Sequence, residues 1–482
     1  MDPTSYQGND KVLIGFVLAV LTFWLFAGSM MNVSPVMGAS LGINANTMNI
    51  AVSLAALFSG IFIVVAGGVA DSIGRVKVFR IGLWLAIVGS LLVGLAAGGS
   101  AVALLLIGRA LQGLSAALVM PTSLGMLKIF WEGKARQRAI SLWSIGTFGG
   151  SGLSSICGGL LTYAFGWRSI FFFAAVVAVA ALYLTRGLPE NKREGAGRYR
   201  PDWGGIIVFM IAMIALQVFI TKGSEFGWFN LITITLLAIT LTFGYLFIRI
   251  ENKAPFAFVD FNLFKNKIFT GATLANFFIN GTAGLLIVSL TLMQRGAQFS
   301  AMQAGLLTLG FAVAVIAFIR VGEKLLQRYG AKKPIVWGAL IIAAAVLLLM
   351  QTQLMTTQYV VLAVIAYALF GLGLAFFATP ATDAAMSNLP DSQAGTGAGI
   401  YKMASSLGTS FGIAIAAGIY TAVAGRTTPI GWLSALISFD GRQDNVAIRQ
   451  GAMLGLAFCL LLTVLVIITV LALIPDREND TL

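Results

Sequence analysis

Histidine is absent from the sequence, cysteine occurs twice and charged residues are scarce, and each shortage excludes a class of protein. Without histidine, any proton transfer has to use aspartate, glutamate, lysine or tyrosine side chains. Cys157 and Cys459 lie inside apolar runs, which excludes both a disulfide framework and a cysteine metal site. Only 10% of the residues are charged, whereas soluble globular domains carry about 25%. This composition is that of a membrane protein.

Hydrophobic residues, which make up 58% of the chain, are gathered into fourteen long runs. Each run is close to the ~20 residues that a helix needs to cross the hydrocarbon core of a bilayer. Because lipid offers no partners to backbone amides, we predict an all-α integral membrane protein with about fourteen transmembrane helices. The predicted spans are residues 12–33, 49–69, 78–98, 101–127, 140–164, 169–188, 204–222, 229–250, 269–293, 302–322, 334–351, 359–380, 395–424 and 450–474. The first run is too long for a cleaved signal peptide.

The net charge of +13 is distributed in a way that indicates membrane orientation and not a nucleic-acid partner. If the amino terminus is cytoplasmic, twenty lysine and arginine residues fall on inner loops and six on outer loops. That excess is the positive-inside bias of membrane proteins. We therefore expect both termini in the cytoplasm and no binding of nucleic acid.

Three regions follow from the spacing of the spans. We predict a six-helix bundle over residues 1–190 and a second six-helix bundle over residues 268–482, related by a pseudo-twofold axis. Residues 191–267 between them contain a polar linker, two extra transmembrane helices and an amphipathic segment. In that segment Phe256, Val259, Phe261, Leu263 and Phe264 are mixed with Lys265 and Lys267, so we expect it to lie along the inner surface.

The two bundles resemble diverged copies of one unit. Gly74 lies 62 residues after the start of the first span, and Gly330 lies 61 residues after the start of the ninth. The fifth helix of each bundle also has glycines four residues apart, which allow close helix packing: Gly146 and Gly150 in one, Gly408 and Gly412 in the other. Repeated bundles with a site between them are typical of alternating-access transporters.

A charged turn follows the second span, and we call five of its residues the gating motif: Gly67, Asp71, Gly74, Arg75 and Lys77. Topology alone explains basic residues on an inner loop, but not an acid and glycines at fixed spacing. The turn resembles the loop signature of the major facilitator superfamily. The resemblance implies that the motif packs against a neighbouring helix when the inner side is shut, and releases it when that side opens.

Two further motifs extend this resemblance. Arg109, Gln112 and Gly113 match the second motif of the superfamily, and Gly150, Gly158 and Gly159 match its antiporter motif. The central Gly-Pro of the antiporter motif is Ser154-Ser155 here, so this motif alone does not predict antiport. Fourteen spans and runs such as FWLFAGSMMNVSP and WSIGTFGGSG resemble the fourteen-span drug:proton antiporters, in particular the Nor-type quinolone efflux proteins of Gram-positive bacteria.

The resemblance implies a proton-coupled exporter of small amphipathic drugs such as quinolones. Such a protein would use the proton gradient and no cofactor, and would act as a monomer in the bacterial cytoplasmic membrane.

Few acids are placed to carry a proton through the membrane. Of the 18 acidic residues, only Asp71, Glu323 and Asp383 are embedded in or next to predicted helices. The aspartate that related transporters carry in the first span is missing here. We therefore predict that Asp383 or Glu323 carries the proton. Arg320 and Lys324 lie close to Glu323 in sequence, so an ion pair is its alternative role, and Asp383 is the better candidate.

Two cations lie deep inside predicted spans, where a charge is costly and usually faces a cavity or a partner. Arg109 fits helix packing and transport equally well. Lys402 either reaches the inner surface with its long side chain or lines a substrate cavity, together with polar residues at helical spacing. The predicted cavity contains Lys402, Tyr401, Ser405, Ser406 and Thr409 of one span, Asn276 and Asn280 of another, and Phe23, Trp24 and Asn32 of the first.

Enzymatic chemistry finds no support in the sequence. The stretch GTGAGIYK at Gly395 lacks the Gly-Lys-Ser/Thr end of a phosphate-binding loop and lies inside an apolar run, so we expect no ATP site. No pair of nucleophile and base has catalytic spacing, and no metal site is expected. Two alternatives to drug export stay open: a transporter of an anionic metabolite, which the buried cations favour, and a membrane assembly protein that does not transport.

Overall fold

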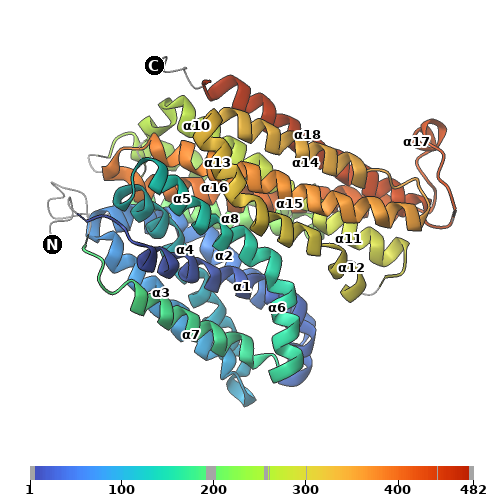
Figure 1. The fold of residues 1–482 in the computed structure, drawn as a ribbon. Helices are drawn as coiled ribbons and strands as arrows, with labels where there is room; N and C mark the ends of the chain where they lie inside the picture. Colours follow the sequence, from blue (N-terminus) through green and yellow to red (C-terminus); the bar gives the residue numbers. More distant parts are fainter. Residues whose placement is uncertain are drawn as a thin grey trace. The chain divides into compact units, whose positions relative to one another are not determined.

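The computed structural model describes residues 6–190, 202–254, 259, 261–299, 301–441 and 443–476. Every regular element in these ranges is a helix, which confirms the prediction of an all-α protein (Figure 1). The first seven helices are α1 (Asp10–Leu41), α2 (Ala45–Ile73), α3 (Arg75–Gly94), α4 (Ala101–Phe130), α5 (Gly133–Ser144), α6 (Gly150–Phe165) and α7 (Arg168–Leu184). One π-helical turn, η3 (Ile145–Gly149), joins α5 to α6.

The remaining helices follow the same order as the predicted spans. They are α8 (Trp203–Phe226), α9 (Leu231–Glu251), α10 (Lys267–Gly281), α11 (Gly284–Gly296), α12 (Ala301–Leu307), α13 (Leu309–Tyr329), α14 (Lys332–Leu349), α15 (Thr356–Ser387), α16 (Ala394–Ala424), α17 (Gly431–Leu436) and α18 (Val446–Leu473). Three short 3-10 helices are η2 (Gly98–Ser100), η4 (Phe261–Lys265) and η5 (Asp391–Gln393). The short helix α17 lies outside the predicted spans.

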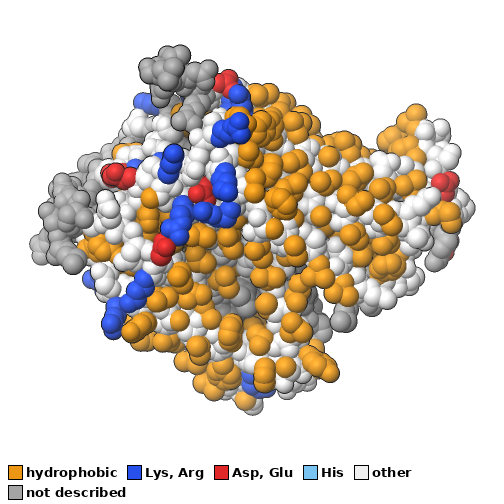
Figure 2. All heavy atoms as spheres, viewed as in Figure 1, with side chains coloured by type: hydrophobic (Ala, Val, Ile, Leu, Met, Phe, Trp, Pro, Cys, Tyr) orange, Lys and Arg blue, Asp and Glu red, His pale blue; other side chains and the backbone are white. Residues whose placement is uncertain are grey.

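Eleven helical segments in the described ranges are long and apolar enough to cross a membrane. The number is twelve if α6 and α7, which bend by 115° at their junction, count as one broken span. Figure 2 shows hydrophobic side chains over much of the visible face, with most of the visible lysine and arginine side chains in one region of it. Extended apolar surfaces of this kind mark a protein that faces lipid.

Local sequence explains where the first helices begin and end. The Asn9 side chain accepts a hydrogen bond from the Val12 amide at 2.9 Å, and Asn44 caps α2 in the same way through the Thr47 amide. Asparagine at these positions satisfies amides that a helix leaves without partners. Gly42 ends α1 with a φ of 66°, a left-handed conformation that glycine adopts without strain.

The chain forms two compact units. The first contains Met1–Gln217, Thr235–Phe269 and Ala385–Met403, and the second contains Val218–Ile234, Thr270–Ala384 and Ala404–Leu482. In the first unit, α4 packs closely against α2 and α3. A methyl group on Gly108 would lie 2.8 Å from the Gly89 carbonyl oxygen, so glycine is needed where α3 and α4 cross.

The second unit repeats the packing devices of the first. Gly408 and Gly412 of α16 rest on the backbone of α10 at Phe277 and Gly281. In the first unit Gly146 and Gly150 lie against α1 less tightly, since methyl groups there would come 3.1 Å from the Val17 carbonyl oxygen and 3.2 Å from Trp24 Cβ. Gly74 and Gly330 both have positive φ, 120° and 74°, at the ends of α2 and α13. The predicted duplication of the two bundles stays a prediction.

The predicted amphipathic segment is described only in part, and Phe256 lies outside the described residues. Val259 and Leu263 are buried, whereas Phe264 is 40% exposed. A 3-10 helix, η4, carries Phe261, Leu263 and Phe264. The segment therefore has one buried side and one exposed side.

Candidate functional site

The gating motif caps the start of α16. Asp71, the 4% exposed acid near the end of α2, accepts hydrogen bonds from the amides of Gly395 and Thr396, each at 2.8 Å. The Thr396 hydroxyl donates a third bond to it at 2.9 Å. A carboxylate in this position satisfies free amides and complements the positive end of the helix dipole. Asp71 therefore holds residues 394–396 against α2 within the first unit.

Arg75 connects the same carboxylate to the chain before α16. Its Nε donates to Asp71 Oδ1 at 2.8 Å, and its Nη2 donates to the Asp391 carbonyl oxygen at 2.7 Å. A side chain on Gly67 would collide with the backbone of Gly395, so the first glycine of the motif permits this close approach. Lys77, the last motif residue, is exposed on the first turn of α3.

Basic side chains from the α4–α5 region also hold the segment before α16. Lys128 forms an ion pair with the Asp391 carboxylate, and Arg136 Nη2 donates to the Ser387 hydroxyl at 2.7 Å. Asn266 Nδ2 donates to the Asn388 carbonyl at 3.2 Å. The contacts of Lys128 and Arg136 could not be predicted, because lysines and arginines on inner loops are expected from topology alone.

Arg109 and Gln112 of the second motif join three helices. Arg109 is 1% exposed and donates to the Ala51 carbonyl of α2 at 3.0 Å and to Gln112 Oε1 at 2.7 Å. Gln112 Nε2 in turn donates to Ser90 Oγ of α3 at 3.2 Å. Gly113 rests on the α2 backbone at Ala55. These contacts are those that a helix-packing role requires.

The antiporter motif lies along α6, which packs on α1. A methyl group on Gly150 would come 3.2 Å from Trp24 Cβ, and one on Gly158 would come 2.6 Å from Ser29 Oγ. Ser29 Oγ donates to the Ser154 carbonyl at 2.8 Å. Nothing lies within 4 Å of a methyl group placed on Gly159. Two of the three motif glycines are thus contact positions and the third faces open space.

The two acids proposed to carry a proton differ in their surroundings. Glu323 of α13 is 4% exposed, forms an ion pair with Arg320 and accepts a hydrogen bond from Gln327 Nε2 at 3.2 Å. Asp383 of α15 is 5% exposed and follows Pro380, which lies within the helix. The ion pair expected as the alternative role of Glu323 is therefore present.

Lys402 lies on the face of an aromatic ring. Its Nζ is 4.3 Å from the centre of the Trp143 ring in α5, and the side chain is 7% exposed. Trp143 is fully buried and fixed by a hydrogen bond from Nε1 to Ser123 Oγ at 3.0 Å. Among the described residues, no carboxylate or hydrogen-bond acceptor partners the ammonium. A cation–π contact partly compensates for the burial of this charge.

The predicted cavity residues are divided between the two units. In the second unit, Asn276 Nδ2 donates to Ser405 Oγ at 2.6 Å, Asn280 Nδ2 donates to Asn276 Oδ1 at 2.9 Å, and Thr409 donates to the Ser405 carbonyl at 2.9 Å. Ser406 is half-buried on the same helix.

In the first unit, Phe23 and Trp24 make an edge-to-face pair with ring centres 5.4 Å apart. Trp24 Nε1 is buried and has no partner among the described residues. Tyr401 is 1% exposed beside Lys402, and the side chain of Asn32 lies outside the described part of the structure.

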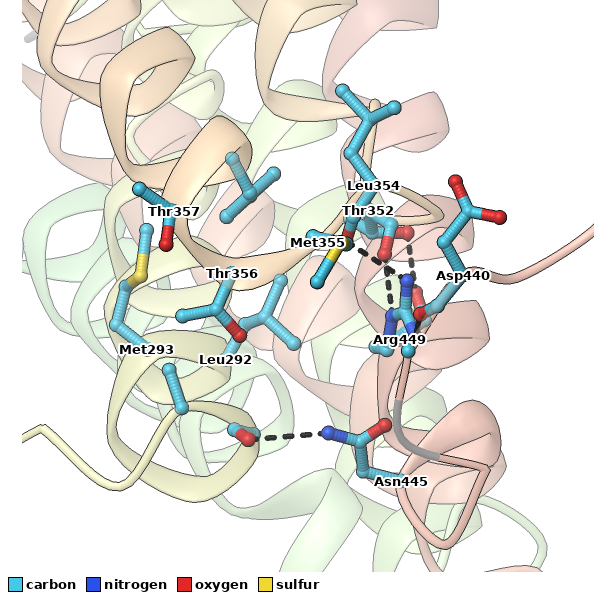
Figure 3. A pocket seen from close by; sticks show the side chains of 14 residues that line it. Leu292, Met293, Thr352, Leu354, Met355, Thr356, Thr357, Asp440, Asn445 and Arg449 are labelled. Atoms are coloured by element: carbon cyan, nitrogen blue, oxygen red, sulfur yellow. Dashed lines mark hydrogen bonds between the residues drawn. The ribbon is translucent and has the colours of Figure 1, made fainter.

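A pocket of about 210 Å³ lies elsewhere in the second unit, at the ends of α11, α15 and α18 (Figure 3). Arg449 forms one wall and donates to the carbonyls of Thr352 at 2.6 Å, Leu354 at 2.9 Å and Asp440 at 2.7 Å. Arg449 is one of the six basic residues expected on outer loops, and the sequence predicts no other role for it. None of the predicted site residues lines this pocket.

Comparisons with known proteins agree with the motifs. A family model described as "Major Facilitator Superfamily" matches residues 12–413 and 269–478. The quinolone resistance protein NorB of Staphylococcus aureus (strain MRSA252) is 44% identical over 477 residues, which are 99% of this chain and 98% of that protein.

Two solved structures share the fold. One is the proton:xylose symporter XylE, with a TM-score of 0.63, 15% identity, and coverage of 97% of this chain and 95% of that one. The other is the human organic anion transporter MFSD10, with a TM-score of 0.61, 14% identity, and coverage of 95% and 98%. The resemblance inferred from the sequence motifs is confirmed. The chain belongs to the Major Facilitator Superfamily and is a multi-pass membrane transporter.

Proposed function

We propose that this transporter exports amphipathic drugs, quinolones among them, in exchange for protons. The observation that carries the proposal is the 44% identity with a quinolone resistance protein over nearly the full length of both chains. The exchange is driven by the proton gradient, which supplies about 2.3 kcal/mol per charge for every 100 mV of membrane potential. No cofactor takes part.

Fourteen spans are part of this proposal. The eleven segments that satisfy length and hydropathy criteria leave out α1, the combined helix α5–η3–α6, and α7. α1 has 32 residues and α7 has 17, and α5 to α6 runs from Gly133 to Phe165. Adding these three helices to the eleven gives fourteen crossings.

The arrangement in the membrane follows from this count. An even number of spans places both termini on one side, and the distribution of lysine and arginine makes that side the cytoplasm. The chain acts as a monomer in a bacterial cytoplasmic membrane. Its functional organisation is two six-helix bundles, residues 1–190 and 268–482, with the extra helices α8 and α9 in the segment 191–267.

Three sets of residues have separate roles in the proposed cycle. The gating motif opens and closes the inner side through the bond between Asp71 and the start of α16. Asp383, which follows Pro380 within α15, carries the proton, and Glu323 forms an ion pair with Arg320. Lys402 binds the carboxylate of a zwitterionic drug, since its ammonium is buried over Trp143 without an acid partner in the described residues.

The experiment that tests the proposal measures efflux of a panel of dyes and quinolones, with and without a protonophore. Cells that express the chain should accumulate less drug than controls, and the protonophore should abolish the difference. Equal accumulation in both strains, at verified expression, would reject drug export.

Transport of an anionic metabolite is the second candidate, and the buried Lys402 favours it. Purified protein in liposomes should then catalyse counterflow of a labelled carboxylate that drugs inhibit poorly. Counterflow that quinolones block completely would instead support drug export through the same site.

A further inference from the structure

The first turn of α3 lacks a capping side chain of its own. Gly74 occupies the N-cap position and has no side chain to accept the free amides. Those amides are those of Val76 and Lys77, and both donate to the carboxylate of Glu190, to Oε1 and Oε2 respectively, each at 3.0 Å. Glu190 follows α7 and lies 114 residues after Val76. The cap of α3 is therefore supplied by a distant part of the chain.

Gly74 also makes room for this carboxylate. A methyl group at Gly74 would lie 2.6 Å from Glu190 Cδ and equally close to one of its oxygens. The φ of Gly74 is 120°, which disfavours any other residue at this position. Gly74 therefore has two roles: it adopts the backbone conformation of the turn, and its missing side chain leaves space for the Glu190 carboxylate.

The capped turn carries Arg75, the first residue of α3. From there Arg75 reaches Asp71 at 2.8 Å and the Asp391 carbonyl at 2.7 Å. A second bond, from Arg80 Nη2 to the Arg186 carbonyl at 2.8 Å, ties α3 to the same segment after α7. Any shift of the first turn of α3 would therefore move Arg75 relative to both of its partners.

We propose that Glu190 is a positioning residue for gating. It caps the first turn of α3 from another part of the chain, and so keeps the Arg75 side chain within hydrogen-bond distance of Asp71 and of the Asp391 carbonyl before α16. This inference rests on the proposed transport function but assigns a residue that lies outside the gating motif. Glu190 acts through backbone amides and through the negative charge that a helix N-terminus favours.

Glu190→Gln tests the proposal, since it removes the charge and keeps only one acceptor oxygen. We expect the maximal transport rate to fall about 3- to 10-fold, in line with the loss of a helix cap, with KM for the drug unchanged. Glu132→Gln is the matched control, because Glu132 is the exposed N-cap residue of α5 and makes no side-chain cap bond. That variant should transport at the wild-type rate.

A second measurement does not depend on transport. In a background with Cys157→Ser and Cys459→Ser, Ala398→Cys places a thiol at a fully buried position of α16. Its reaction with a maleimide reports how often the start of α16 leaves the first unit. Glu190→Gln should accelerate labelling about 3- to 10-fold, and Glu132→Gln should not.

The outcomes separate the two proposals. Wild-type labelling and wild-type transport in Glu190→Gln would overturn the role of Glu190 and leave the drug-export function intact. A wild-type protein that moves no drug would reject the function, while faster labelling in Glu190→Gln would still support the positioning role. If the Gln variant does not reach the membrane, Glu190→Asp is used instead, because its shorter side chain cannot reach both amides. Unchanged maleimide labelling of Ala398→Cys in the Glu190→Asp variant would overturn the proposal.

Discussion

Asp71 satisfies four donors at once, from Arg75, the two amides of α16 and the Thr396 hydroxyl. Asp71→Asn keeps the shape of the side chain, but its amide nitrogen would face donors and Arg75 would lose its anion. Hydrogen bonds to charged groups contribute about 1.5–3 kcal/mol, so we expect drug transport to fall at least about 10-fold, with normal membrane insertion. Efflux is measured at matched expression.

Asp476→Asn is the control for this variant. Asp476 pairs with Lys332 at 3.0 Å but is 69% exposed, and exposed pairs contribute about 1 kcal/mol or less. Wild-type efflux in Asp71→Asn would show that its bond to α16 does not control the cycle.

The two buried acids are distinguished by proton release during transport. Asp383→Asn should abolish drug-driven proton movement in proteoliposomes while leaving some drug binding. Glu323→Gln should keep drug-driven proton movement, because the Glu323 carboxylate forms an ion pair with Arg320 and accepts a hydrogen bond from Gln327. The reverse pattern would assign the proton to Glu323, and loss of coupling in neither variant would remove both acids from the mechanism.

Lys402 permits a prediction about substrate choice. Lys402→Met should reduce transport of a zwitterionic quinolone about 10-fold or more, because a carboxylate would lose a charge-assisted partner. A permanently cationic dye should be transported almost as before, and Lys402→Arg should retain part of the quinolone transport. Equal loss for both substrates in the Met variant would make Lys402 a packing or gating residue.

The sequence indicated these residues but not their partners. The spacing of Asp71 and the glycines predicts a gating turn, yet Gly395 lies 324 residues further along the chain and no local pattern points to it. The spacing of polar residues predicts that Lys402 belongs to the polar stripe of its own helix, whereas the described contact is with Trp143. A tryptophan inside an apolar run gives no signal of such a role, because the contact depends on tertiary packing.

At the scale of elements, the contact between α16 and α10 is tight, because a methyl group on Gly412 would overlap the Gly281 carbonyl oxygen. A methyl group on Gly412 would meet the backbone of Gly281 in α10, where neither helix has a flexible group that can give way. Gly412→Ala should therefore destabilise the protein by about 1–3 kcal/mol, as overpacking does. Thermal unfolding in detergent measures the difference.

Gly159→Ala in α6 is the control substitution at an uncrowded helix position. A methyl group there meets nothing within 4 Å, and replacing glycine by alanine inside a helix raises stability by about 0.4–1 kcal/mol. The two variants should shift the unfolding temperature in opposite directions. A lower unfolding temperature for Gly159→Ala than for Gly412→Ala would contradict this account of the packing.

Helix positions were largely predictable, since each long apolar run corresponds to one helix or to two consecutive ones. The positions at which a run breaks into two helices could not be predicted. Gly281 and Gly284 bracket the break between α10 and α11, and both press on α16, so the break depends on a neighbour that the run itself does not reveal. Pro121 and Pro380, in contrast, lie within continuous helices, α4 and α15.

For the whole molecule, the count of crossings can be tested at the turn between α8 and α9. Fourteen spans place this turn outside, so Asn230→Cys, at an exposed position, should react with a membrane-impermeant maleimide added to intact cells. Asn252→Cys, exposed after α9, should react only after the membrane is opened. Both variants are made without the native cysteines. Labelling of neither site from outside would mean that α8 and α9 do not cross the membrane.

The bond between Asp71 and α16 also sets an order of events during synthesis. Gly395 is made 324 residues after Asp71, which corresponds to about 16–65 s at translation rates of 5–20 residues per second. Over that interval the carboxylate has Arg75, four residues away, as its nearest partner. The opposite charges of Asp71 and Arg75 therefore balance each other while the first helices enter the membrane, and the contact with α16 forms only after most of the chain has been made.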